Sequence, residues 1–96
     1  MNIRILDEAE QDLLDGVLFY DAQGQGLGDY FFDSLSADIA SLKLFGGIHP
    51  LRLGFHCLFA DRFPYAIYYK VVKHVVYVQA VLDCRRNPTW IKKRLK

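Results

Sequence analysis

The clearest structural signal in the chain is Phe63-Pro-Tyr-Ala-Ile-Tyr-Tyr69, which is followed by an apolar run from Val75 to Leu82. Aromatic and β-branched residues dominate both segments, and these residue types favour the half-buried surface of a β-sheet. Lys73-His74 leaves room only for a tight reversal, so the two segments should pair as antiparallel neighbours. We therefore predict strands over 63–72 and 75–83.

The N-terminal half predicts a short strand followed by a helical hairpin. Residues 2–6 alternate between apolar and polar types, as in a strand with one buried face. Apolar residues then recur at helical spacing over 8–22 and again over 29–45, with a glycine-rich turn between the two helices. Asp7 is expected to cap the first helix, and Glu10 stands three residues later, in the position of a reciprocal capping partner.

The predicted fold class is α+β, with the element order β-α-α-β-β-β. A strand over 51–59 precedes the two strands already described, and the helical hairpin should pack on one face of this small, mainly antiparallel sheet. In the middle strand Ala66, Tyr68 and Lys70 share the second face, which Lys70 marks as the wetter one. That face is expected to be partly open, and the whole chain, 1–96, is expected to form one domain.

Charge is divided unevenly along the chain. Residues 1–38 hold nine acids and one base, a net charge of −8, whereas residues 39–96 hold eleven bases and two acids, a net charge of +9. Such a dipolar chain can attract an acidic ligand to one pole and a basic partner to the other. A solvated acidic helix face with a basic tail and no ligand would produce the same pattern.

Composition excludes several classes of protein. The apolar fraction of 52% is too high for a disordered chain, and no apolar segment approaches the roughly 20 residues that cross a bilayer. The N-terminus does not resemble a secretory signal, so we expect a cytoplasmic protein without membrane contact. Cys57 and Cys84 lie in no metal-type spacing, and we expect free thiols, with a disulfide between them as the open alternative. No metal or cofactor is expected.

Two adjacent arginines, Arg85 and Arg86, directly follow the last predicted strand. Neighbouring guanidinium groups repel each other and pack poorly in a core, so they are usually placed to meet an anion. A bulge in the last strand would exchange its two faces, which leaves open which of the two arginines lies on the exposed side of the sheet. Trp90 and Arg94 follow in the same basic segment. The alternative for one of these arginines is a pair with an N-terminal acid such as Asp12 or Asp15.

Several short motifs along the chain occur together in a characteristic order. They are Glu8-Ala-Glu-Gln-Asp-Leu13, Phe19-Tyr20, Gly26-Leu-Gly28, Arg62-Phe-Pro-Tyr-Ala-Ile-Tyr-Tyr69, Val78-Gln-Ala-Val-Leu82, and Arg85-Arg86-Asn-Pro88 with Trp90. In this order, and over nearly its whole length, the chain resembles the ParE/RelE superfamily, the toxins of bacterial type II toxin–antitoxin systems. The resemblance implies a helical hairpin on a small sheet and a cognate antitoxin as partner, in a homodimer or a larger toxin–antitoxin assembly.

The two branches of this superfamily differ in what they poison. ParE-like toxins bind DNA gyrase and trap it on cleaved DNA, which causes growth arrest, whereas RelE-like toxins cleave messenger RNA on the ribosome. A third alternative is a weakly toxic or non-toxic module that only binds an antitoxin.

The catalytic pattern of the RelE-like branch carries over poorly. RelE-like chains have an arginine in the middle strand where this chain has Ala66. Arg86 matches the arginine that ends the last strand, but the tyrosine that follows it in the family has no match, because Thr89 and Trp90 stand there. The resemblance therefore implies the ParE-like branch, with Arg86 as a catalytic residue only if the chain is a nuclease.

The resemblance and the charge pattern together give two sets of candidate site residues. Those expected to bind the target are Arg62, Arg85, Arg86, Trp90 and Arg94. Those expected to bind the antitoxin are Tyr68, Lys70, Arg85 and Arg86.

Overall fold

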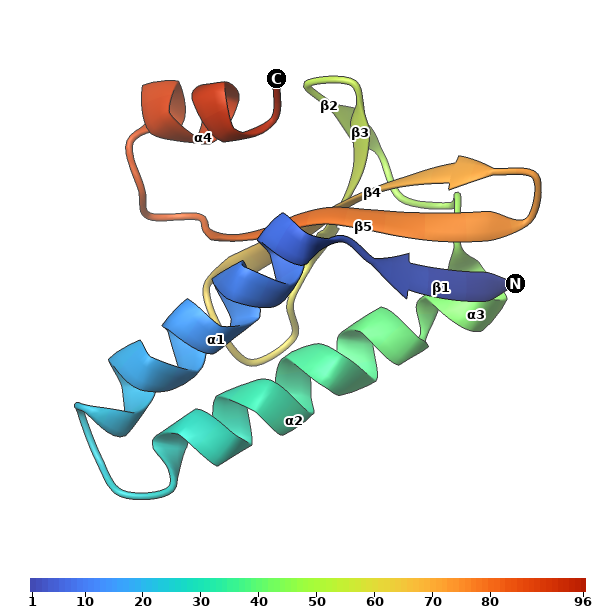
Figure 1. Ribbon diagram of the computed structural model, residues 1–96. Coiled ribbons are helices and arrows are strands. Elements are labelled where there is room, and N and C mark those ends of the chain that lie inside the picture. Colours follow the sequence, from blue (N-terminus) through green and yellow to red (C-terminus); the bar gives the residue numbers. More distant parts are fainter.

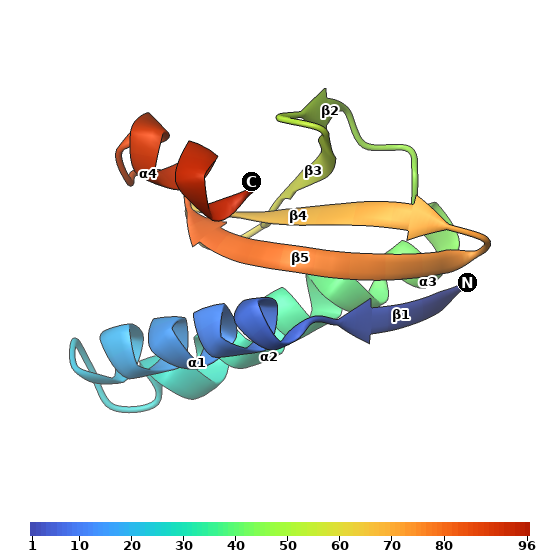
Figure 2. The same ribbon diagram turned by 45° about the horizontal axis from the view of Figure 1, so that its top comes forward.

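A computed structural model describes residues 1–96 (Figures 1 and 2). A five-stranded sheet has the strand order β1-β5-β4-β3-β2; β1 runs parallel to β5, and every other neighbouring pair is antiparallel. The elements in chain order are β1 (Asn2–Ile5), α1 (Asp7–Asp21), α2 (Leu27–Ala40), α3 (Leu42–Phe45), β2 (Leu51–Arg52), β3 (Phe55–Phe59), β4 (Tyr65–Val72), β5 (Val75–Asp83) and α4 (Pro88–Arg94). The predicted α+β class and the helical hairpin are confirmed.

The helical hairpin packs on one face of the sheet, as Figure 2 shows with α1 and α2 beneath the strands. Its core joins the apolar stripes of both helices to Ile67 and Tyr69 of β4 and to Val76 and Val78 of β5. The two helices cross closely at Gly16, where an added Cβ would lie 2.5 Å from ring carbons of Phe31. The periodic apolar residues of the sequence therefore mark the true core face of the hairpin.

A bulge in β5 exchanges the two faces of that strand. Tyr68 pairs with Ala80 and Tyr69 pairs with Val78, so Gln79 is the extra residue on β5. Before the bulge, Val78 faces the helical hairpin and belongs to its core. After the bulge, Ala80 belongs to the apolar cluster on the opposite face of the sheet. Arg86 therefore lies beyond the point where the faces have been exchanged, which simple alternation cannot show.

The second face of the sheet is covered over part of its area by α4, a helix that the prediction of a partly open face did not include. Figure 2 shows α4 above the strands, on the side opposite to α1 and α2. Its Ile91, with Leu95, packs on Ala66, Tyr68 and residues of β5 in a second apolar cluster. The missed signal is Asn87-Pro88: the Asn87 side chain accepts a hydrogen bond from the backbone N–H of Thr89, and proline occupies the first helical position.

The predicted strand over 51–59 is wrong in detail, because it is a hairpin of two short strands. Leu53 and Gly54 form its two-residue turn, with φ angles of 55° and 85°. Leu53 therefore occupies a left-handed conformation that an L-residue with a branched side chain rarely adopts. The predicted reversal at Lys73-His74 is confirmed, again with positive φ at both residues. The strand predicted over 63–72 begins at Tyr65.

The predicted capping pair of α1 is also wrong. The helix begins at Asp7, and the residue before it, Leu6, makes no side-chain capping bond. The backbone N–H of Leu6 instead donates to the Val78 carbonyl at 3.0 Å, so the edge of the sheet fixes the start of the helix. The helix predicted over 29–45 begins at Leu27 and breaks at Ser41, whose hydroxyl donates to the Asp38 carbonyl at 2.6 Å.

Candidate functional site

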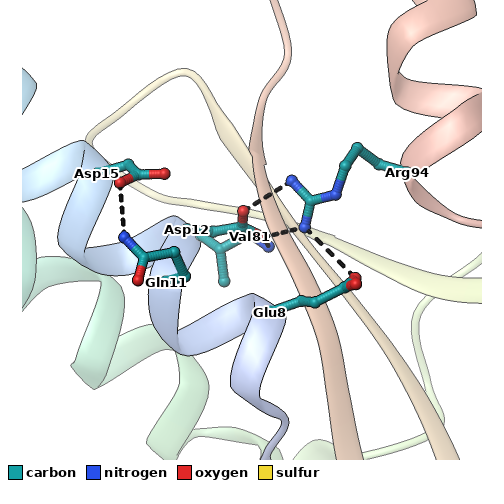
Figure 3. A network of polar contacts seen from close by, with 6 residues as sticks. All are labelled: Glu8, Gln11, Asp12, Asp15, Val81 and Arg94. Atoms are coloured by element: carbon teal, nitrogen blue, oxygen red, sulfur yellow. Dashed lines mark hydrogen bonds and ion pairs between the residues drawn. The ribbon is translucent and has the colours of Figure 1, made fainter.

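The three C-terminal arginines are in three different environments. Arg94 forms two hydrogen bonds with Asp12 of α1, at 2.7 and 2.9 Å, and lies 3.9 Å from Glu8 (Figure 3). Asp12 is 9% exposed and also accepts a hydrogen bond from the Val81 backbone N–H at 3.0 Å. This arrangement is the predicted alternative of an arginine paired with an N-terminal acid. Arg94 thus ties α4 to α1 and to β5.

Arg85 is paired with the last residue of β5. Its Nε and Nη2 atoms donate to the two carboxylate oxygens of Asp83 at 3.0 and 2.7 Å. The hydrogen bonds from Arg85 hold the pKa of the Asp83 carboxyl below its usual range. Arg85 is exposed, but its positive charge is largely neutralised by the carboxylate of Asp83, two residues earlier in the chain.

Arg86 has no carboxylate partner. Its guanidinium carbon lies 3.8 Å from the centre of the Trp90 ring, and this is the closest cation–aromatic contact in the molecule. A guanidinium stacked on indole keeps its N–H edge free for an anion. Of the three C-terminal arginines Arg85, Arg86 and Arg94, only Arg86 has a guanidinium without a hydrogen-bonded carboxylate.

A groove of about 390 Å³ lies between the β2–β3 hairpin and α4. We call it the hairpin–α4 groove, and it contains two cationic side chains and no acidic one. Its lining residues are Arg52, Leu53, Phe59, Tyr68, Cys84, Arg86, Pro88 and Ile91. The Arg52 guanidinium lies over the ring of Phe59, 5.2 Å from its centre, and forms no ion pair. Sequence reasoning missed Arg52, because a lone arginine near a chain reversal carries no local signal.

Arg86 also borders a second cavity, of about 340 Å³, between α1 and α4. Its walls include Trp90 together with the acids Asp12, Asp15 and Asp83. Arg86 therefore lines both the cavity that contains three acids and the groove that contains two cations, and the ring of Trp90 fixes the position of its guanidinium.

The other predicted site residues lie apart from Arg86 and Trp90. Arg62 lies beside α2, where it contacts Tyr30 Oη at 3.3 Å and Asp61 at 3.9 Å. Lys70 is exposed, with its ammonium 4.7 Å from the centre of the Phe55 ring. Tyr68 is 5% exposed beneath α4, so the expectation that it lies on an open face is wrong.

Tyr69 is fully buried and anchors the loop before β2. Its hydroxyl accepts from the Gly47 backbone N–H at 3.0 Å and is hydrogen-bonded to Nδ1 of His49. His56 stacks on the Tyr69 ring, and its Nδ1–H donates to the His49 carbonyl at 2.7 Å. A neutral His49 imidazole can accept the hydroxyl proton of Tyr69 at Nδ1, whereas a protonated imidazole cannot accept it.

We predict that the melting temperature falls as the pH is lowered through the histidine range. Burial, and then the neighbouring His56, lower the pKa of His49 below its ordinary 6.5. Above that pH both folded and unfolded chains hold a neutral His49, and below it the unfolded chain takes up the proton first, so stability is lost on acidification. The measurement is thermal unfolding between about pH 7.5 and 5.5.

His49→Asn keeps an acceptor for the Tyr69 hydroxyl, and it should reduce this pH dependence. His74→Asn is the matched control, because His74 is exposed in the β4–β5 turn. An unchanged pH profile in His49→Asn would refute the assignment of the effect to His49.

The two cysteines are free thiols, one buried and one exposed. Cys57 is buried in β3, and Cys84 follows β5 at the wall of the hairpin–α4 groove. Burial raises the pKa of the Cys57 thiol, and partial burial of the Cys84 sulfur raises the pKa of that thiol as well. The expectation of two free thiols is confirmed.

One comparison with solved structures gives a clear likeness. A chain in the structure described as "Chromosomal ParDE TA system from P. aeruginosa" superposes on this chain with a TM-score of 0.75. The two proteins share a fold. The match covers 84% of this chain and 92% of that chain, at 15% sequence identity. No family model and no curated protein matches the sequence. No helix is both long enough and apolar enough to span a bilayer.

Proposed function

We propose that the chain is the toxin component of a type II toxin–antitoxin system, that it inhibits DNA gyrase in the cytoplasm, and that a cognate antitoxin neutralises it. The observation that carries this proposal is the shared fold with a chain of a ParDE toxin–antitoxin system, which extends over 92% of that chain. The ordered ParE/RelE motifs of the sequence support it independently. The predicted sheet and helical hairpin are those that the resemblance implies.

The geometry of the groove favours the gyrase-directed branch over a ribonuclease. Cleavage by a 2′-hydroxyl requires a base and charge stabilisation at the phosphate. Ala66 is 1% exposed beneath α4 and offers no cation. Burial raises the pKa of Tyr68 to about 12, so its phenol stays protonated at neutral pH and does not act as a base. Arg52 and Arg86 supply positive charge alone.

Within this proposal the predicted target-binding residues take different roles. Arg86 and Trp90 are the principal contacts, because the guanidinium is unpaired and the indole holds it in place. Arg85 is an exposed cation beside Arg86 and contributes through the local field, whereas Arg62 lies apart from Arg86 and contributes only to the long-range field. Arg94 acts as a positioning residue, since its contacts with Asp12 hold α4.

Expression of the chain without a partner is expected to arrest growth, with DNA damage appearing before protein synthesis stops. A purified gyrase assay should show accumulation of cleaved DNA when the chain is added. In vitro translation should show no new cuts in messenger RNA. Arrest of translation before any DNA damage, with messenger RNA cut on the ribosome, would contradict the proposal and favour the RelE-like alternative.

The variant Arg86→Ala should relieve growth arrest while leaving the melting temperature nearly unchanged. Replacing a surface cation usually changes stability by less than about 0.5 kcal/mol, whereas losing a charge-assisted contact to a target costs several times that. Lys93→Ala is the matched control, because Lys93 is an exposed cation of α4, the helix that follows Arg86. A large loss of stability, with toxicity retained per folded molecule, would contradict the role given to Arg86.

A further inference from the structure

We propose that the hairpin–α4 groove docks an acidic segment of a partner protein, with carboxylates bound by Arg52 and Arg86 and an apolar side chain inserted between them. The inference rests on the proposed function in one respect: it takes this partner to be the neutralising antitoxin. The evidence lies in the unpaired charges, in the exposed apolar rim and in one strained residue.

The two guanidiniums of the groove are unpaired in a molecule whose other nearby arginines are paired. Arg85 and Arg94 each hold a carboxylate at 2.7 Å, while Arg52 and Arg86 form no ion pair. Arg52 lies over the ring of Phe59, which lines the groove, and Arg86 lies on the ring of Trp90, which lines the neighbouring cavity between α1 and α4. Stacking holds a planar guanidinium in place and leaves its N–H fork directed away from the ring, ready for a carboxylate.

The rim of the groove exposes two large apolar side chains. Leu53 is 50% exposed and Phe59 is 54% exposed, and Ile91 and Pro88 form the facing wall. Leu53 has a φ of 55°, where glycine or asparagine would be unstrained. The turn thus presents a leucine at a position that its backbone conformation disfavours, which is understandable if the side chain serves binding.

The chemistry of the groove favours a protein segment over a nucleic acid. Most of its lining is apolar, and only two cations are present. A single-stranded nucleic acid needs a track of cations along its backbone and flat aromatic platforms for successive bases. One apolar side chain flanked by carboxylates matches the cavity of about 390 Å³ and its two guanidiniums better. A segment bound here would also cover Arg86, and so would keep it from the target.

The test is a selection of displayed random peptides on the purified full chain. Enriched peptides are expected to carry Asp or Glu on both sides of a large apolar residue. Synthetic copies should bind at least about tenfold more weakly to Arg52→Ala and to Arg86→Ala, the loss that follows from removing one charge-assisted hydrogen bond. Lys93→Ala should bind as the unmodified chain does. Trp90, the only tryptophan, gives a fluorescence signal beside Arg86.

Leu53→Asn separates binding from folding. Asparagine relieves the left-handed strain, so the melting temperature should not fall, while peptide affinity should drop several-fold with the loss of the apolar contact. A single-stranded oligouridine is the competing probe and should not displace the peptides. The proposal is overturned if no peptide is enriched, if the enriched peptides lack acids, if their affinity ignores Arg52 and Arg86, or if oligouridine displaces them.

The outcomes distinguish this inference from the proposed function. A partner that still neutralises growth arrest by the Arg52→Ala variant, with unchanged affinity, would remove the groove as its site and leave the toxin–antitoxin proposal intact. Failure of the chain to arrest growth or to affect gyrase would remove the proposed target, while the peptide measurements would still decide whether the groove binds acidic segments.

Discussion

Replacement of Asp12 by alanine is expected to lower the free energy of unfolding by about 3–5 kcal/mol, the cost of removing one partner of a buried ion pair. The Asp12 carboxylate accepts two hydrogen bonds from Arg94 and one from the Val81 backbone N–H (Figure 3). Its loss leaves a partly buried guanidinium and a buried peptide donor unsatisfied together. The measurement is urea unfolding of the purified chain at neutral pH.

Asp15→Ala is the matched control, one turn further along α1. The Asp15 carboxylate is exposed and accepts only from Gln11, at 2.9 Å. Its removal should change stability by no more than about 0.5 kcal/mol. If the two variants unfold alike, Asp12 does not hold α4 in place, and the α4 wall of the hairpin–α4 groove is not supported by the contacts between Arg94 and Asp12.

Replacement of Phe31 by alanine is expected to cost about 3–5 kcal/mol, the range for deleting a fully buried aromatic side chain. Phe31 is 0% exposed, and its ring packs on those of Tyr20, Phe63 and Tyr65 at 4.8–5.1 Å between centres. It also meets Gly16 where the two helices cross, so little in the hairpin can collapse into the vacated space. Thermal and urea unfolding measure the loss.

Phe32→Ala deletes the same atoms from the neighbouring residue and serves as the control. Phe32 is 44% exposed on the outer side of α2. We expect a small loss of stability for Phe32→Ala and a large one for Phe31→Ala, because only the deletion at position 31 creates a cavity. Equal losses would contradict the orientation of α2. For a domain of this size each kcal/mol shifts the melting temperature by roughly 4–8 °C, so Phe31→Ala should leave little folded protein at 37 °C.

Several features of the fold could be predicted because their causes are local. The β4–β5 hairpin follows from two strand-forming segments with only Lys73-His74 between them. The helical hairpin follows from apolar residues at helical spacing on either side of a glycine-rich turn. The choice of Arg86 and Trp90 as candidates also came from sequence, since a basic segment directly after a strand is visible without coordinates.

Other features depend on contacts that local patterns do not encode. The capping pair predicted at Asp7 fails because a sheet hydrogen bond from Leu6 decides where α1 begins. The cover over Tyr68 was not predicted, because it depends on Ile91 and Leu95, two apolar residues in a basic tail, packing on the cluster around Tyr68. A seven-residue helix is too short to be stable alone, and it forms here because tertiary packing supports it.

The amino-acid sequence alone determines that this chain builds an α+β domain with an acidic hairpin and a basic C-terminal end, because periodicity and charge belong to the residues themselves. Tertiary structure alone decides which of Arg85, Arg86 and Arg94 has no carboxylate partner. Arg94 finds Asp12 across 82 positions of sequence, Arg85 turns back onto Asp83, and Arg86 stacks on Trp90. The bulge at Gln79 exchanges the two faces of β5, the strand that precedes these arginines. Pairing depends on distance in space, so three similar arginines acquire three different roles only after folding.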